Sequence, residues 1–229
     1  MSQKETPKSA LFNIIFNIVI PSVILSKYSD NGHLGPVKGL LVAVSFPIVY
    51  GLWDLIVLKK WNFVSILGFA SILLTGGLAL FKLDGFWFAV KEASVPVIIG
   101  LVVFFTAKSK YNLVRSIILN PQVIKVDLIE SKIRENNQEE EFERLIIKTT
   151  YLFVLSFVVS AILNFVLAMV ILKSPAGTPE FNQELGKMVA LSYPVIMVPS
   201  MIVLILSLIF LIRGLTRMTG HSYQDLLNG

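Results

Sequence analysis

The chain has no cysteine and only two histidines among its 229 residues. Without thiols it forms no disulfide, no iron–sulfur cluster and no thiolate zinc site, and it has no catalytic cysteine. His33 and His221 lie far apart along the chain, which argues against a histidine metal site or a Ser/His triad. The sequence also lacks any other arrangement of nucleophile, acid and base. We therefore expect no metal, no cofactor and no enzymatic activity.

Charged residues are also scarce, at 15% of the chain, whereas soluble domains carry about 25%. Hydrophobic residues make up 55% and are gathered in blocks near 20 residues long, the length that crosses a bilayer. The sequence therefore predicts an all-α, polytopic membrane protein with six transmembrane helices arranged as three hairpins. The six predicted spans are Ala10–Ser26, Gly39–Leu58, Phe63–Phe81, Phe86–Ala107, Thr149–Leu172 and Met188–Ile212.

The net charge of +5 comes from basic residues whose positions indicate membrane topology rather than a surface that binds nucleic acid. With a cytoplasmic N-terminus, 14 Lys and Arg residues fall in inside segments and five in outside segments. This bias obeys the positive-inside rule and predicts that both termini are cytoplasmic. We expect helices 1–4 in residues 1–107, a cytoplasmic connector in 108–148, and helices 5–6 with a short tail in 149–229. The expected surroundings are lipid; the sequence does not indicate an oligomeric state.

The connector of residues 108–148 is the one long polar segment. After Asn120-Pro121, a helix-start signal, Val126, Ile129 and Ile133 recur at helical spacing among charged residues. This pattern predicts a short amphipathic helix on the cytoplasmic surface. The acidic run 139–141 then leads into a cytoplasmic extension of the fifth helix. The segment is either a platform for a protein partner or, as we favour, a solvated connector.

A Ser-x-Pro motif recurs in the even-numbered helices and suggests an internal repeat. One offset of 147 residues also aligns Asn17 with Asn164 and Gly39 with Gly186. A true repeat would consist of hairpins of like orientation. The motif occurs at Ser45-Phe46-Pro47, Ser94-Val95-Pro96 and Ser192-Tyr193-Pro194.

Prolines inside the predicted helices are expected to produce kinks, since each removes one helical N–H donor. The carbonyls left without partners either line a polar cavity or are satisfied by nearby serines and neighbouring helices. The expected kinks are at Pro21, Pro47, Pro96 and Pro194.

Polar residues at membrane depth are the candidate functional groups, because a charge there costs roughly 3 kcal/mol on insertion scales. Neighbours point about 100° apart on a helix, so Lys91 and Glu92 are each expected to need a separate partner. Glu92 is the first candidate, for proton coupling. The candidate substrate or proton pathway consists of Glu92, Lys91, Asp54, Tyr50, Asn17 and Asn164.

Each of these groups also has a structural interpretation. Asp54 lies near the cytoplasmic end of its span and would then sit at the headgroup level, where Tyr50 is placed to hydrogen-bond it. Lys91 would extend toward the interface. Asn17 and Asn164 would form hydrogen bonds that hold helices together.

Two stretches resemble the bacterial intracellular septation protein A family. Gly76-Gly77-Leu78, Asp84, Phe88 and Lys91 match its glycine-pair, acidic-turn and lysine pattern, and Asn164 to Ala168 with Phe181 and Gly186 resembles a later region. The chain is more similar still to an uncharacterised set of bacterial inner-membrane proteins of this length. The resemblance, over residues 60 to 215, implies an inner-membrane protein of envelope maintenance or division without catalytic residues. The longer connector and Glu92 depart from the septation family.

Two functions follow from these patterns. Kinked helices, intramembrane charges and a repeat are typical of a small transporter with a polar cavity near Glu92. The resemblance instead implies a non-catalytic scaffold that recruits envelope or division proteins through residues 108–148.

Overall fold

A computed structural model describes residues 14–56, 74, 77, 81, 83–109, 111–119 and 124–227. Within this part of the chain all regular secondary structure is helical, apart from one isolated antiparallel bridge between Ile124 and Leu227. The predicted all-α class is therefore confirmed. The chain divides into two compact units, the first formed by 1–95 and 161–197 and the second by 96–160 and 198–229.

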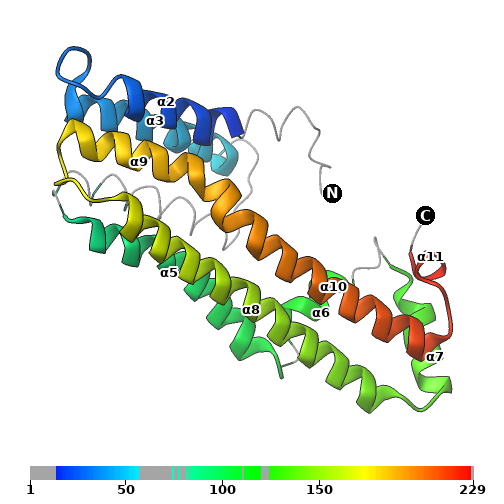
Figure 1. Cartoon of the computed structure of the whole chain (residues 1–229). Helices are drawn as coiled ribbons and strands as arrows, with labels where there is room; N and C mark the ends of the chain where they lie inside the picture. The colour runs from blue at the N-terminus through cyan, green and yellow to red at the C-terminus, as the bar shows by residue number, and fades with distance from the viewer. Residues whose placement is uncertain are drawn as a thin grey trace. The chain divides into compact units, whose positions relative to one another are not determined.

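Figure 1 labels the α-helices, and the two π-helices, which are not labelled there, are named η1 and η2. They are η1 (Ile15–Val19), α2 (Ile20–Lys27), α3 (Gly35–Ile56), α5 (Gly85–Thr106), α6 (Leu113–Ile118), α7 (Val126–Glu135), α8 (Glu139–Ile171), α9 (Pro179–Ser192), η2 (Tyr193–Met197), α10 (Val198–Thr219) and α11 (Tyr223–Leu226).

Four helical stretches in the described part are long and apolar enough to cross a bilayer, as expected of a membrane protein. They are Gly35–Trp53, Gly85–Thr106, Glu139–Ile171 and Pro179–Thr219. Each contains or overlaps one of the predicted spans. A shorter apolar helical stretch, Ile15–Lys27, coincides with most of the first predicted span. Nearly all of the predicted span Phe63–Phe81 lies outside the described residues.

Two helices begin well before the apolar run that predicts them. Helix α8 begins at Glu139, because three successive glutamates suit the positive end of the helix dipole. Helix α9 begins at Pro179, where the Thr178 hydroxyl accepts a hydrogen bond from the Phe181 N–H at 3.2 Å. Threonine at the N-cap followed by proline is a start signal that a search for apolar windows overlooks.

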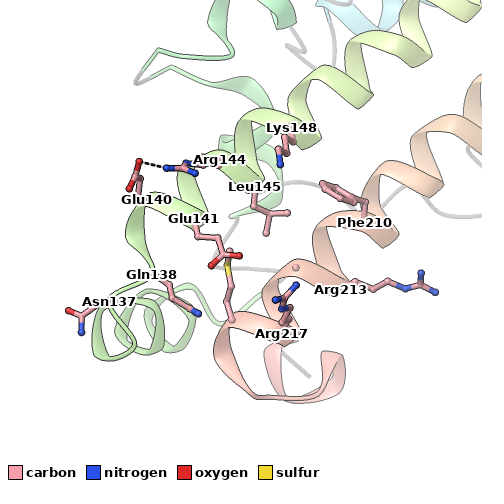
Figure 2. Close-up of a pocket in the computed structure, with 12 residues that line it drawn as sticks. Asn137, Gln138, Glu140, Glu141, Arg144, Leu145, Lys148, Phe210, Arg213 and Arg217 are labelled. Atoms are coloured by element: carbon pink, nitrogen blue, oxygen red, sulfur yellow. Dashed lines mark hydrogen bonds and ion pairs between the residues drawn. The ribbon is translucent and has the colours of Figure 1, made fainter.

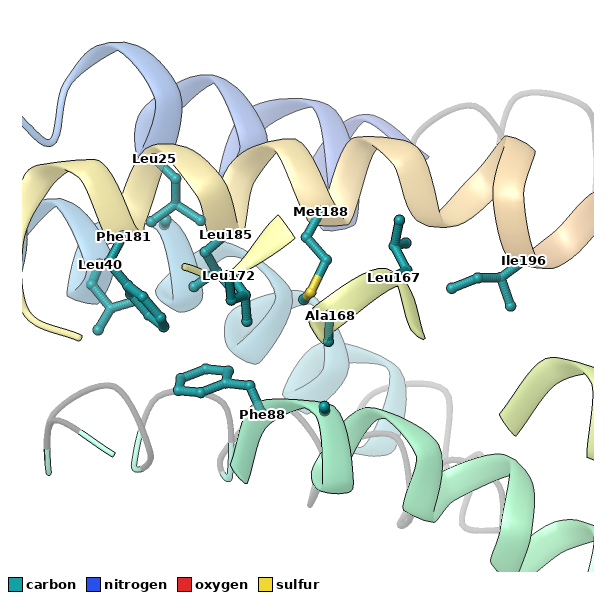
Figure 3. Packing of buried hydrophobic residues seen from close by; sticks show 12 residues of the cluster. Leu25, Leu40, Phe88, Leu167, Ala168, Leu172, Phe181, Leu185, Met188 and Ile196 are labelled. Carbon is teal, nitrogen blue, oxygen red and sulfur yellow. The ribbon is translucent and has the colours of Figure 1, made fainter. Parts of the chain in front are cut away.

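The first unit is organised around α9, which packs against α2 and α3. Its core is apolar and includes residues of α2, α3, α5, α8 and α9 (Figure 3). Phe181 of α9 and Phe88 of α5 are fully buried, with their rings edge to face and 5.1 Å between centroids. The Asn182 amide donates to the Pro36 carbonyl at 2.6 Å, so a polar contact joins α9 to the start of α3.

Helices α9 and α2 approach each other closely at Gly186. A Cβ at this position would lie 2.7 Å from Ser26 Oγ and 2.9 Å from the Ser22 carbonyl oxygen. A side chain larger than hydrogen therefore has no room between the two backbones.

Gly186→Ala is expected to destabilise the protein by about 1–3 kcal/mol, because the two helices must separate to relieve the overlap. Denaturant titration of the purified protein in detergent measures the loss. Gly32→Ala is the control, since a Cβ there first meets an atom at 3.5 Å, and it should change stability by less than about 0.5 kcal/mol. Equal effects from both substitutions would contradict the close packing.

The prolines are accommodated in three ways. Pro47 and Pro96 lie inside α3 and α5, Pro194 lies within η2, and Pro21 follows η1 in the first turn of α2. A π-turn widens the helix locally, which is one recognised way for a helix to bend. The π-helices were not expected from the sequence.

The serines of the Ser-x-Pro motifs bond to their own helices. The hydroxyls of Ser45, Ser94 and Ser192 donate to the carbonyls of Val42, Lys91 and Met188, at 2.7, 2.6 and 2.9 Å. Each proline leaves the carbonyl four residues before it without a helical donor. The carbonyls that accept from the serines lie one or two residues before that position and are therefore different groups. The serines are thus satisfied within the helix, but they do not replace the missing N–H groups.

The second unit contains a folded cap, the name we give to α6, α7 and α11. Ile129 and Ile133 of α7 are buried with residues of α8, α10 and α11 in a second apolar core. The predicted amphipathic helix is confirmed. The apolar side of α7 packs into this core, whereas Asp127, Ser131 and Arg134 are exposed on its other side. The choice between a partner platform and a solvated connector stays a prediction.

Polar contacts join the cap to the long helices. The buried Asn112 amide donates to the Ala107 carbonyl at 2.7 Å and to Thr150 Oγ1 of α8 at 3.0 Å, and its oxygen accepts from the Arg115 N–H. The Asn136 amide donates to the Met218 carbonyl of α10 at 2.9 Å. These bonds fix α6 and α7 to the helices that they cover.

Helix α11 closes the cap. The Lys125 N–H donates to the Leu226 carbonyl at 2.9 Å, and Leu226 is buried in the core of the second unit. Ser222 and Asp225 form a capping box, in which the Ser222 hydroxyl and N–H donate to the carboxylate. These hydrogen bonds hold the pKa of Asp225 below its ordinary value.

Candidate functional site

The charged candidates Lys91 and Glu92 of α5 bond to each other. Lys91 Nζ lies 2.7 Å from Glu92 Oε1, and the side chains are 8% and 25% exposed. This mutual contact was not expected from the angle between neighbouring residues on a helix. Although the two Cβ atoms point to different sides of the helix, the four-carbon lysine stem is flexible enough to bring the ammonium back to its neighbour.

The surroundings of the pair are apolar and close to a proline. Phe88 and Ala89, in the preceding turn of α5, are fully buried in the core of the first unit. Pro96 has no N–H, so the Glu92 carbonyl loses its usual helical donor. The carboxylate and a weakened stretch of helix therefore lie together within an apolar segment.

An ion pair between adjacent residues has a limited structural value. The contact lies within one helix and so does not cross-link two helices. Buried pairs generally contribute little net stability, because the cost of desolvation offsets the attraction.

The other polar candidates lie on different elements. Asn17 is in η1 and Asn164 in α8, both partly buried. Tyr50 of α3 stacks its ring against Phe16, with centroids 6.3 Å apart. Asp54 lies in α3, but its side chain is outside the described part, so its hydrogen bond with Tyr50 remains a prediction.

A cavity of about 310 Å³ lies beside Tyr50 in the first unit. Ser45 and Tyr50 contribute hydroxyls, and the rest of the lining is apolar: Phe16, Phe46, Val49 and Trp53. It adjoins the Ser-x-Pro motif of α3, where we expected a polar cavity. This cavity is mainly aromatic, and neither Lys91 nor Glu92 lines it.

A larger cavity of about 620 Å³ lies in the second unit, where α8 begins and α10 ends (Figure 2). The sequence patterns did not predict this cavity. The available signal was a pair of cations four residues apart on each helix, Arg144 with Lys148 and Arg213 with Arg217. Residues four apart share a helix face, but only the tertiary structure shows that the two faces meet.

The described residues contain no cluster of three or more His, Cys, Asp or Glu side chains that could hold a metal ion. Comparison with protein-family models, with curated proteins and with solved structures finds no match. The function is therefore argued from the geometry of the chain itself.

Proposed function

We propose that this chain is a small transporter whose polar pathway includes the Lys91–Glu92 pair. The supporting observation is the ion pair itself, with atoms 2.7 Å apart in an apolar helix long enough to span a bilayer. Ionisable groups at membrane depth are expensive and commonly mark ion or substrate paths. The pair is therefore the first candidate in this chain for a group on such a path.

In this proposal Glu92 is the proton-binding group and Lys91 its counter-ion. Protonation of Glu92 removes its negative charge from beside the Lys91 ammonium, which then attracts an anionic substrate or an anionic side chain more strongly. The missing helical bond at Pro96 makes this part of α5 easier to bend as the charge changes. Asp54, Tyr50, Asn17 and Asn164 are the further members of the proposed pathway.

Thiol accessibility tests the pathway, since an introduced cysteine is the only thiol in the chain. Val95→Cys places it one turn from the pair and within about 60° of both residues around α5. In membrane vesicles, an impermeant anionic methanethiosulfonate should modify Val95→Cys at least about ten-fold faster than Val97→Cys. Only a hydrated thiol ionises and reacts readily, and Val97 is directed to another side of the helix.

Two further cysteines calibrate the sides of the membrane in the same experiment. Asn31→Cys, in the exposed loop before α3, should react from outside intact cells, and Ser131→Cys of α7 only after lysis. This pattern of labelling is expected if the chain lies in the inner membrane with both termini in the cytoplasm. Reaction of Ser131→Cys from outside would reverse the proposed orientation. If Val95→Cys reacts from neither side of the membrane, the proposed pathway is overturned.

The second candidate is a membrane scaffold for envelope maintenance or division, as the septation-protein resemblance implies. The observation that favours it is the cap, which is folded onto α8 and α10 rather than a loose linker. Its exposed face carries Asp127, Arg134 and Glu135, a charged surface suited to a protein partner. A scaffold needs no hydrated path, so it predicts an unreactive Val95→Cys together with a reactive, accessible Ser131→Cys.

We further propose six membrane helices with an internal repeat. At the offset of 147 residues, Gly39 and Gly186 are both buried, and a Cβ at either would overlap a serine of the α2 region. Ser45 and Ser192 also both donate to the preceding turn. These similarities between positions 147 residues apart are the support for the proposed repeat.

A further inference from the structure

The cavity of the second unit lies at one end of the apolar runs of α8 and α10. Lys148 directly precedes the apolar part of α8, and Arg213 directly follows that of α10. The two helices touch at Leu145 and Gly214, where a Cβ on the glycine would overlap the leucine methyl groups at 2.4 and 2.6 Å. This contact places four cationic residues of the two helix ends around one hollow, at the level where a bilayer changes from hydrocarbon to headgroups.

The lining of the cavity carries a net positive charge. Arg144, Lys148, Arg213 and Arg217 outnumber Glu140 and Glu141 by two. Arg144 is bonded to Glu140, both on the exposed surface of α8 (Figure 2). In the part of the chain that the structure describes, Lys148, Arg213 and Arg217 form no ion pair. These three lining cations therefore have no protein anion bound to them among the described residues.

The same lining also contains a buried polar atom for which the described residues supply no hydrogen bond. Gln138 Oε1 is buried and has no hydrogen-bond partner among the described residues. Rotation of the side-chain amide by 180° exchanges its oxygen and nitrogen, so this end of Gln138 serves equally as a donor. A ligand with several oxygen atoms would satisfy both the amide and the cations.

We propose that this cavity binds the phosphate group of an anionic phospholipid from the leaflet on the cap side. Guanidinium groups match phosphate with paired, charge-assisted hydrogen bonds, and basic pockets between membrane helices recognise lipid headgroups. The lining also includes the exposed ring of Phe210, which continues into the exposed apolar residues Leu206 and Ile209 of α10. The acyl chains of a lipid can lie along this apolar surface while its phosphate occupies the hollow. A free phosphate has no group that would contact the apolar surface.

The test is native mass spectrometry of the full chain in dodecylmaltoside, titrated with dioleoylphosphatidylglycerol. Neutralising two cations with Arg213→Gln and Arg217→Gln should weaken binding about 10- to 30-fold, the effect expected for two basic residues near a lipid surface. The control Lys132→Gln with Arg134→Gln removes the same charge from α7, outside the cavity, and should bind within about two-fold of the parent. Dioleoylphosphatidylcholine, which has no net charge, should bind the parent at least about ten-fold more weakly.

Two results would overturn the proposal. An equal loss in the control would show attraction to overall charge rather than to the cavity. Inorganic phosphate that binds the parent and displaces the lipid at millimolar concentration would assign the cavity to a soluble anion. Thermal unfolding without lipid checks the fold of the variants, and Lys148→Gln replaces the double variant if that one unfolds. The inference does not depend on the choice between transporter and scaffold.

Discussion

Glu92→Gln is expected to lower the free energy of unfolding by about 2–4 kcal/mol, because it removes the anion bound to the nearly buried Lys91 ammonium. The value lies somewhat below that of a fully buried pair, since Glu92 is 25% exposed. The double variant Lys91→Met with Glu92→Gln removes both charges and should recover stability to within about 1 kcal/mol of the parent. Denaturant titration of all four proteins in detergent completes the double-mutant cycle.

An exposed pair of the same residue types provides the control. Lys132 and Glu135 on α7 lie 2.6 Å apart, and Lys132→Met with Glu135→Gln should show a coupling of at most about 1 kcal/mol. A Lys91–Glu92 coupling no larger than this would mean that water already screens the pair. The cycle also separates structure from function: a double variant that regains stability but loses thiol reactivity at Val95→Cys places the charges in the pathway.

Phe181→Ala is expected to cost about 3–5 kcal/mol, the largest effect of any single change considered. The side chain is fully buried at the centre of the first unit, and its ring packs against Phe88. Removal of the ring leaves a cavity that the surrounding helices fill only partly. Since Phe88 lies three residues before Lys91, the change should also loosen α5 beside the ion pair. Thermal and denaturant unfolding measure the first effect, and faster hydrogen exchange of α5 amides the second.

Phe105→Ala is the matched control, because that ring is 75% exposed and its loss should cost less than about 1 kcal/mol. Phe181→Leu keeps most of the volume and should lose less than Phe181→Ala. If Phe181→Ala and Phe105→Ala were equally mild, α9 would not be the centre of the first unit.

Much of the fold could be predicted from local patterns. Runs of apolar residues indicated the long helices, and the spacing of Val126, Ile129 and Ile133 predicted α7, whose two isoleucines are buried. The acidic run 139–141 indicated that α8 extends well before its apolar part. The start of α9 was predicted too late, because its first turn is polar and is stabilised by an N-cap. The π-helices beside Pro21 and Pro194 have no signal that distinguishes them from ordinary proline kinks.

The candidate sites were less predictable than the helices. Lys91 and Glu92 were identified correctly as charges within an apolar helix, but their mutual contact depends on how the lysine side chain bends. The cavity of the second unit requires Arg144 and Lys148 to meet Arg213 and Arg217, which are far away in the chain. The close contact of Leu145 with Gly214 brings them together, and no spacing in the sequence reports it.

The sequence by itself determined that this is a helical membrane protein with few charges, no thiol chemistry and prolines within its helices. These properties follow from hydrophobicity and backbone geometry, which act over one or two helical turns. Only the tertiary structure decided that Lys91 contacts Glu92, that the connector folds into a cap, and that three cations with no ion pair among the described residues line one cavity. Such contacts depend on side-chain conformation and on helices packed from distant parts of the chain, and local patterns do not encode either.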